Sequence, residues 1–526
     1  GSLFANGTVT DSIIFEPNDA NSTSNGQWTG IKFYGNSSSS VSKSELSYFR
    51  TSYGGNGNWP QGAVVVYNKS SGLSGVDSTM ISHGLIHNSS DRGVSVYNNR
   101  RDTNYGQPGT KPYVHLSNLH IHSHQQDGLR IDYNYETEIK VESLNVHDNN
   151  QDGVDIYNNY DNTMVSIDSL RSVNNSGRGL YVYRAESGAN IKVRNGDFHS
   201  NGSNQVEVRY VESSGGHFSL RNSKIEDDTP DDSYWAVYAY DCCEDNNDLS
   251  STLDFRLNNW GSTVTALMNS GTNPQDLDEI HDYYEGNYYP LVNYAGFAGA
   301  NTSNAGFTGE VLISSASGAD LSNNVPIGTT QINLHLFDPD LAATGSASVT
   351  VTSSVDADDE VVALTESTDR PGHFSGSLNL SETTFRIIED EEQFLADVAV
   401  EMENVSQEFP YWSDDEVESR ARTTVYDVYF ENAVERYNNP QSNNSRDDGS
   451  LDVAGAALIT VTYTDAAGDF GAAATSSEVT VYGGISGNIT GVLTAANSPY
   501  VVTGDIFVAE DDSLTIEAGV TMQFFG

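Results

Sequence analysis

Cysteine is nearly absent from this chain. Its 526 residues include two cysteines, and these two, Cys242 and Cys243, are adjacent. Adjacent cysteines do not make a disulfide framework, and their spacing does not match a zinc site. A strained vicinal disulfide and a pair of buried thiols both remain open.

Basic side chains are scarce as well. The chain has 25 Lys and Arg residues against 73 Asp and Glu residues, a net charge of −48 at pH 7. Such a field repels nucleic acid and anionic lipid, so we expect no nucleic-acid partner. A solvated surface, a saline habitat and abundant bound Ca²⁺ are all compatible with the charge.

Long apolar runs are missing, and no stretch is long enough to span a bilayer. We therefore expect no membrane span in this segment, although an anchor or sorting signal could lie outside it. The apolar content of 37% can supply hydrophobic cores. A chain of this length has room for two to four domains.

Helical spacing is absent from the first part of the chain, where a repeat of short strands is found instead. Each repeat has a small marker residue followed by alternating apolar positions, as in "QDGLRIDYN" (Gly128), "QDGVDIYNN" (Gly153) and "GRGLYVYRA" (Gly179). In "SNQVEVRYV", Gln205 takes the marker position, and the steps between these markers are 25, 26 and 26 residues. A unit this short cannot bury its apolar side chains alone, but stacked coils can. The repeat therefore predicts a parallel β-solenoid.

Residues 1–299 resemble the right-handed parallel β-helix proteins of the pectate-lyase-like class, in the form found in large bacterial and archaeal surface proteins. "FRLNNWGSTVTALMNSG" resembles the exit segment of such helices, and "PYVVTGDIFVAEDDSLTIEAGVTMQFFG" resembles their opening coils. The resemblance covers about two thirds of the chain. It implies a fold much more than an activity, because this fold carries lyases, hydrolases, adhesins and spacers.

The pattern changes after residue 299. Longer alternating strands in 300–384 and 449–483 look like two parts of an Ig-like β-sandwich of the kind repeated in bacterial surface proteins. The acidic insert 385–448 has near-helical apolar spacing, and residues 484–526 form opening coils. The predicted class is all-β: a right-handed parallel β-helix plus an Ig-like sandwich with a partly helical insert.

Residues at equivalent positions of successive coils form columns along the β-helix. Two of these columns are expected to face outward on one sheet. Residues two and four positions after each marker include aromatics, carboxylates and arginines. Sugar rings stack on aromatics and sugar hydroxyls bond to charged groups, so these columns form a possible glycan face; cross-strand packing alone also favours Tyr. The candidate residues are Tyr97, Arg130, Asp155, Tyr157, Tyr181, Tyr183 and Glu207.

Paired carboxylates for glycoside hydrolysis are conceivable at Asp152 and Asp155 with Asp127 and Asp132 one coil away. The polygalacturonase pattern also requires an Asp-Asp pair, a Gly-His-Gly and an Arg-x-Lys, and the sequence contains none of them nearby. We therefore expect no enzymatic activity.

A histidine column precedes the markers, at His87, His122, His147 and His199, with Val173 in one coil. Stacked imidazoles could bind a metal, but Val173 interrupts the column and a first-row metal prefers converging ligands. A surface ladder is the simpler interpretation.

Calcium is the predicted possible cofactor. Asp338 and Asp340 in "DPDL", and Asp465 and Asp469 in "DAAGD", place closely spaced carboxylates at strand ends. Oxygen-rich loops suit Ca²⁺, although acidic loops without ions are equally common.

The two terminal stretches, "LTIEAGVTMQFFG" and "GSLFANGTVTDSIIF", read as neighbouring coils of one solenoid. We expect Phe524 of one copy to lie within a coil or two of Leu3 and Phe15 of the next. The expected assembly residues are Leu3, Phe4, Ile13, Phe15, Leu514, Ile516, Val520, Met522 and Phe524.

The sequence thus predicts a structural repeat unit of an extracellular fibre or surface stalk, assembling head to tail with copies of itself. The alternative is a cell-surface β-helix that binds or degrades a polysaccharide. Whether consecutive units are covalently joined is left open.

Overall fold

A computed structural model describes most of the chain. The described residues are 2–18, 27–35, 43–55, 60–67, 70–71, 78–101, 111–211, 215–226, 234–240, 252–286, 289–301, 305–315, 321, 325, 329–353, 359–382, 387–388, 391–438, 450–453, 458–466, 468–469, 475–480, 484–493, 500–508 and 513–524. They divide into two compact units, Gly1–Gly306 and Phe307–Gly526.

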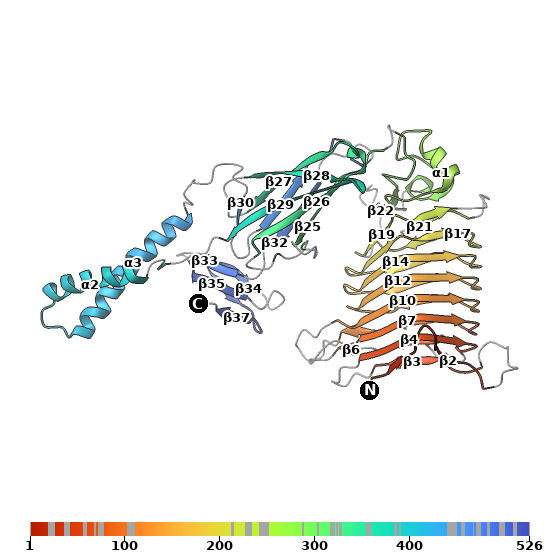
Figure 1. The fold of residues 1–526 in the computed structure, drawn as a ribbon, viewed down its shortest axis with the longest axis horizontal. Helices are drawn as coiled ribbons and strands as arrows, with labels where there is room; N and C mark the ends of the chain where they lie inside the picture. Colours follow the sequence, from red (N-terminus) through yellow and green to blue (C-terminus); the bar gives the residue numbers. More distant parts are fainter. Residues whose placement is uncertain are drawn as a thin grey trace. The chain divides into compact units, whose positions relative to one another are not determined.

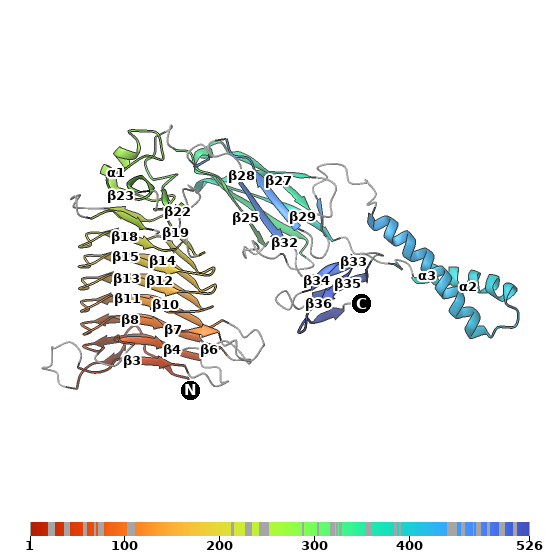
Figure 2. The same cartoon turned by 180° about the vertical axis from the view of Figure 1, so that it is seen from behind.

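The first unit is a stack of parallel β coils (Figures 1 and 2). One sheet of thirteen strands runs along the stack, and all its pairs are parallel. Its strands are β1 (Phe4–Asn6), β2 (Ile13–Phe15), β4 (Lys43–Ser52), β7 (Ser78–His87), β10 (Tyr113–His122), β12 (Glu138–His147), β14 (Met164–Val173), β16 (Asn190–Arg194), β17 (Asp197–His199), β19 (His217–Arg221), β20 (Lys224–Glu226), β22 (Thr252–Asp254) and β24 (Leu291–Asn293).

A second parallel sheet of nine strands forms another side of the coils, and a small pair accompanies it. The nine strands are β3 (Ile31–Tyr34), β5 (Val64–Tyr67), β8 (Val94–Tyr97), β11 (Leu129–Asp132), β13 (Val154–Asn159), β15 (Leu180–Ala185), β18 (Val206–Arg209), β21 (Val237–Tyr240) and β23 (Ile280–His281); the small pair is β6 (Ser70–Ser71) with β9 (Arg100–Arg101). The predicted parallel β-helix is confirmed.

Register places like residues above one another, as the repeat predicts. Val154 pairs with Leu129 in the coil before it and with Leu180 in the coil after it, and all three side chains are fully buried. The marker position is small because a side chain at Gly153 would collide with Ser172 and with the backbone of the next coil. The core is therefore a set of apolar columns along the axis.

Residues with a left-handed backbone bend the coils. The ten-residue strands each contain one positive φ at the same register, for example 53° at Asn118, 55° at Ser143 and 62° at Ser169. Asn is among the side chains that tolerate this conformation best, so corners rich in Asn and Ser fit the sequence.

Buried asparagines connect the coils at another corner. The Asn149 Nδ2 donates to Asn175 Oδ1 at 2.9 Å, and the Asn175 Nδ2 donates to Asn201 Oδ1 at 3.0 Å. Each amide satisfies groups in the neighbouring coil, so polar corners can be buried without unpaired atoms.

The last coils of the first unit include helix α1 (Gly261–Met268) and the short 3₁₀ helix η2 (Tyr283–Glu285). Trp260, directly before α1, is only 1% exposed, and Asn258 Nδ2 donates to the carbonyls of Leu220 and Phe255. This segment therefore packs onto the top of the core.

The second unit begins with an antiparallel β domain. Its strands are β25 (Glu310–Ser315), β26 (Gln331–Phe337), β27 (Ser346–Ser353), β28 (Glu360–Ser367), β29 (Arg370–Glu382), β30 (Ser450–Val453), β31 (Leu458–Tyr463) and β32 (Thr475–Thr480), with the 3₁₀ helix η3 (Pro339–Leu341) after β26. All described pairs are antiparallel except β29 with β30. Buried side chains from β25 to β31 form one core.

Two helices, α2 (Glu391–Glu408) and α3 (Asp414–Asn438), separate β29 from β30 in the chain and pack against each other (Figure 1). Phe394, Val398 and Val425 are buried between them. The predicted partly helical insert is confirmed. Among the described residues, no helix is long and apolar enough to cross a membrane.

The chain then forms two small parallel sheets. One contains β33 (Gly484–Asn488), β35 (Tyr500–Phe507) and β37 (Met522–Phe524), and the other contains β34 (Gly491–Leu493) and β36 (Leu514–Ile516). Strands alternate between the two sheets along the chain, as in the coils of the first unit.

Candidate functional site

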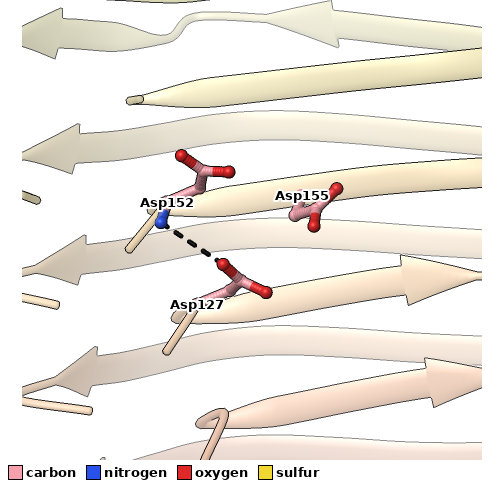
Figure 3. Close-up of side chains that lie close together, drawn as sticks. All are labelled: Asp127, Asp152 and Asp155. Atoms are coloured by element: carbon pink, nitrogen blue, oxygen red, sulfur yellow. Dashed lines mark hydrogen bonds between the residues drawn. The ribbon is translucent and has the colours of Figure 1, made fainter. Parts of the chain in front are cut away.

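Charged side chains gather where the turns of the β-helix enter the nine-stranded sheet. Gly93 in "DRGVSVYNN" is the marker of an earlier coil. The residues directly before the five markers are Arg92, Asp127, Asp152, Arg178 and Asn204. Figure 3 shows Asp127 and Asp152 on neighbouring turns, with Asp155 beside them on β13. Carboxylate oxygens of these three residues lie within 4.8 Å of one another. This is the densest acidic group in the described part of the β-helix that could bind a metal or act on a substrate.

Arginines occupy the space between these acids. Arg130 forms an ion pair with Asp155, its Nε lies 3.0 Å from Asp132 Oδ2, and its Nη1 lies 3.8 Å from Asp127 Oδ2. Arg92 Nε donates to Asp127 Oδ2 at 3.2 Å. Asp127, Asp132 and Asp155 therefore each face a guanidinium group.

Arg178 forms the second centre of the network. Its Nη2 donates to Asp152 Oδ2 at 2.8 Å and its Nη1 donates to Glu207 Oε1 at 3.1 Å. The guanidinium carbon also lies 3.4 Å from the centre of the Tyr181 ring. Arg178 thus joins three coils, because Asp152 and Glu207 belong to the coils before and after its own.

Burial dominates the electrostatics of the network. It raises the pKa of Asp155 well above its usual range, and it raises the pKa of Asp127, with nearby Asp152 adding to the effect. Burial also raises the pKa of Asp132 to about 6, although Arg130 opposes the shift. Burial thus favours the neutral form of these carboxyl groups, and the neighbouring arginines favour the charged form.

The aspartates of the network are almost completely buried. A general acid must reach the oxygen of the glycosidic bond, and a nucleophile must reach the sugar. Asp127, Asp152 and Asp155 are only 2%, 5% and 3% exposed. The arrangement favours a buried ion-pair network that holds coils together.

The predicted glycan face is corrected at three of its residues. Asp155, Tyr181 and Glu207 are 3%, 9% and 3% exposed, so they do not form an open surface. They are covered because the long side chains of Arg130 and Arg178 lie across them.

The other predicted residues of that face are half-buried: Tyr97, Arg130, Tyr157 and Tyr183. The rings of Tyr157 and Tyr183 stack with centroids 4.6 Å apart and planes 11° apart. The Arg130 guanidinium, from the coil before Tyr157, lies 4.6 Å from the centre of the Tyr157 ring. Neighbouring coils therefore cover both faces of this ring, whereas a sugar needs an open face.

The histidine column is a stack of rings. His122 lies between His87 and His147, with centroids 5.4 and 5.0 Å away and nearly parallel planes. Burial, together with the neighbouring His147, His120 and His87, lowers the pKa of His122 to about 4. Within the described residues, the groups able to hold a metal contain only aspartates.

The predicted assembly residues lie at two places. Leu3, Phe4, Ile516 and Phe524 are exposed, at 45%, 64%, 50% and 69%. Half-buried positions are Ile13, Phe15, Leu514, Val520 and Met522. The last three of these pack against Leu493 and Val502 within their own coils. Contact between copies stays a prediction.

The predicted calcium residues are partly brought together. Asp338, Asp340 and Asp465 have carboxylate oxygens within 4.8 Å of one another. Asp469 is not part of that group, and its Oδ1 accepts a hydrogen bond from Thr308 N at 2.7 Å. Cys242 and Cys243 lie outside the described residues.

Sequence reasoning missed the role of the column directly before the markers. "DRG", "QDG", "QDG" and "GRG" place a charge there in four coils, of both signs. The position two residues after the marker also carries charges in several coils. Considered together, these two columns would have indicated ion pairs between neighbouring coils.

Comparison with known proteins adds little. No protein family model and no curated protein matches the chain. One solved structure that matches is full-length tailspike protein 2 of Escherichia coli O157:H7 bacteriophage CAB120, with 12% sequence identity and a TM-score of 0.27. The match covers 70% of this chain and 59% of the tailspike chain. At this level of similarity the fold assignment rests on the strand pairing described above.

Proposed function

We propose that this chain is a structural module of an extracellular fibre or surface stalk, in which the β-helix is a stiff rod. The supporting observation is that charged and aromatic side chains of the outward columns of the nine-stranded sheet bond or stack from one coil to the next. Arg178 links Asp152 and Glu207 across three coils, and the Tyr157 ring is covered by the coils on both sides. Side chains used in this way strengthen the stack along its axis.

Head-to-tail continuation of the β-helix is the second part of the proposal. Strands β1 and β37 are edge strands of parallel sheets, and each carries an exposed phenylalanine, Phe4 on β1 and Phe524 on β37. An edge strand offers unpaired backbone groups, and coils of the same parallel geometry satisfy them best. The proposed occupant is a second copy of this chain, with the antiparallel domain as an Ig-like spacer between successive β-helices.

A non-enzymatic role fits the burial of the carboxylates. The polysaccharide-active alternative would require Asp127, Asp152 or Asp155 to reach a substrate, and each is at most 5% exposed. Glycan binding through Tyr157 would require an open ring face, and Tyr183 and Arg130 lie against this ring. Both alternatives can be tested in the same material.

Electron microscopy and light scattering of the purified full chain test the proposal. We expect end-to-end oligomers of the wild type that grow with concentration, and loss of these oligomers in Phe524→Asp and Phe4→Asp. Val9→Asp is the matched control, since Val9 is 81% exposed but lies outside the strands. Wild-type chains that stay monomeric at every concentration would refute the head-to-tail arrangement. Binding to a polysaccharide panel that Tyr157→Ala abolishes would favour the glycan-binding alternative.

A further inference from the structure

Three aspartates converge in the antiparallel domain of the second unit. Asp338 directly follows β26, Asp340 lies in η3, and Asp465 follows β31. Their carboxylate oxygens lie within 4.8 Å of one another. Asp338 is fully buried and Asp465 is 3% exposed.

Asp340 is the member without a partner. Both of its carboxylate oxygens are buried, each with less than 1 Å² of accessible surface, and neither accepts a hydrogen bond. Leaving a buried carboxylate without any donor is among the costliest arrangements in a folded protein. The backbone N–H of Asp340 donates to Asp338 Oδ1 at 3.2 Å, so the local turn holds the two side chains together.

The other two aspartates are held firmly in place. Tyr463 Oη donates to Asp338 Oδ2 at 2.7 Å, and Gly309 N donates to Asp465 Oδ2 at 2.8 Å. Burial and the nearby Asp465 raise the pKa of Asp338 to about 6, although the hydrogen bond from Tyr463 opposes the shift. The cluster therefore combines fixed geometry with mutual repulsion.

The acidic group of the β-helix differs from this cluster in its positively charged neighbours. There, Arg92, Arg130 and Arg178 neutralise the aspartates. Neither Asp338 nor Asp340 forms an ion pair with any residue that the structure describes. For Asp338 and Asp340, a cation from solution would supply the balancing charge.

We propose that Asp338, Asp340 and Asp465 bind a divalent metal ion, and that the ion is Ca²⁺. All protein ligands are carboxylate oxygens, which hard cations prefer over transition metals. Ca²⁺ also tolerates irregular ligand geometry and completes its shell with water and carbonyl oxygens, whereas Mg²⁺ requires a near-ideal octahedron.

Binding would fasten the first residues of the second unit. Thr308 and Gly309 donate backbone hydrogen bonds to Asp469 and Asp465, so the loop after β31 already holds the segment that leads into β25. An ion on Asp465 would tie that loop to the end of β26. Calcium should therefore stabilise the antiparallel domain against unfolding.

Thermal unfolding of the full chain in EDTA and in CaCl₂ is the first test. Saturating calcium should raise the melting temperature of the second unit by about 5 °C or more, because binding to the folded state alone stabilises it. Asp340→Asn should abolish the rise, yet melt at or above the wild-type temperature in EDTA because it removes a repulsive charge. Asp369→Asn, in the exposed turn between β28 and β29, should keep the full calcium response.

Terbium luminescence locates the site independently of stability. Tb³⁺ replaces Ca²⁺ at oxygen sites and emits when a nearby tyrosine is excited. Emission should be displaced by Ca²⁺ and strongly reduced in Tyr463→Phe, while Asp127→Asn in the β-helix leaves it unchanged. The proposal is overturned if the wild type shows neither a calcium-dependent melting shift nor displaceable emission, or if Asp340→Asn retains both.

Discussion

Single residues decide how polar groups can be buried inside a stack of coils. Asn149, Asn175 and Asn201 occupy one corner position in three successive coils and bond to one another. His124 occupies the same position in the coil before them, and its backbone N–H donates to Asn149 Oδ1 at 3.1 Å. Its ring bridges Ser89 N and the Ile86 carbonyl, which requires a neutral imidazole with one N–H.

The fully buried ring of His124 makes the β-helix sensitive to acid. Burial lowers the pKa of His124 to about 3, from 6.5. A base whose folded pKa is depressed contributes stability above its unfolded pKa and loses it as pH falls. The loss is about 1.4 kcal/mol per pH unit below 6.5. His124→Asn should therefore flatten the dependence of unfolding free energy on pH by about this slope between pH 6.5 and 4.

Urea unfolding of the β-helix transition at several pH values measures that slope. His335→Asn, in the second unit, serves as the control and should leave the slope unchanged. Equal slopes for wild type and His124→Asn would show that the imidazole is not buried neutral. A lower absolute stability of His124→Asn is expected, since Asn fills less of the corner.

At the scale of elements, spacing predicted the strands and failed at their outer surfaces. The alternation after each marker identifies β11, β13 and β15, because inward positions must be apolar in every coil. Alternation also predicted that Asp155 and Tyr181 face solvent, and there it failed. The alternation of residues along a strand predicts the side of the sheet on which a side chain lies. It does not predict whether a long side chain from a neighbouring coil covers that side chain. The unpaired oxygens of Asp340 likewise depend on loop folding, which the spacing of "DPDL" does not specify.

The helical insert offers a test of a single element. Val398 and Val400 lie on α2, but Val398 is 3% exposed in the contact with α3 whereas Val400 is 64% exposed. A buried, unpaired carboxylate costs several kcal/mol, so Val398→Asp should separate the two helices. Helices in proteins owe most of their stability to the packing of their apolar faces.

Circular dichroism at 222 nm reports that loss. We expect Val398→Asp to lose most of the helical signal at 25 °C while the β-helix still melts cooperatively. Val400→Asp should match the wild type within about 0.5 kcal/mol, as exposed substitutions usually do. A full helical signal in Val398→Asp would mean that the pair does not depend on this contact.

At the scale of the whole molecule, the charge excess is the dominant feature. The acids described in the β-helix network are paired with arginines, but 73 acidic residues cannot all be matched by 25 basic ones. The unmatched negative charges repel one another more strongly in the compact state than in the unfolded chain. Salt and calcium relieve this repulsion in different ways, since salt screens every charge and calcium acts where carboxylates converge.

Raising NaCl from about 10 mM to 1 M shortens the Debye length from about 30 Å to about 3 Å. The melting temperature should rise by at least about 2 °C, the shift that roughly 1 kcal/mol gives a domain of this size. Calcium chloride at equal ionic strength should add a further rise confined to the second unit and absent from Asp340→Asn. A melting temperature that falls or stays constant in NaCl would mean that the excess charge is fully solvated and does not destabilise the folded state. The calcium increment would then be the one charge effect that the two titrations detect.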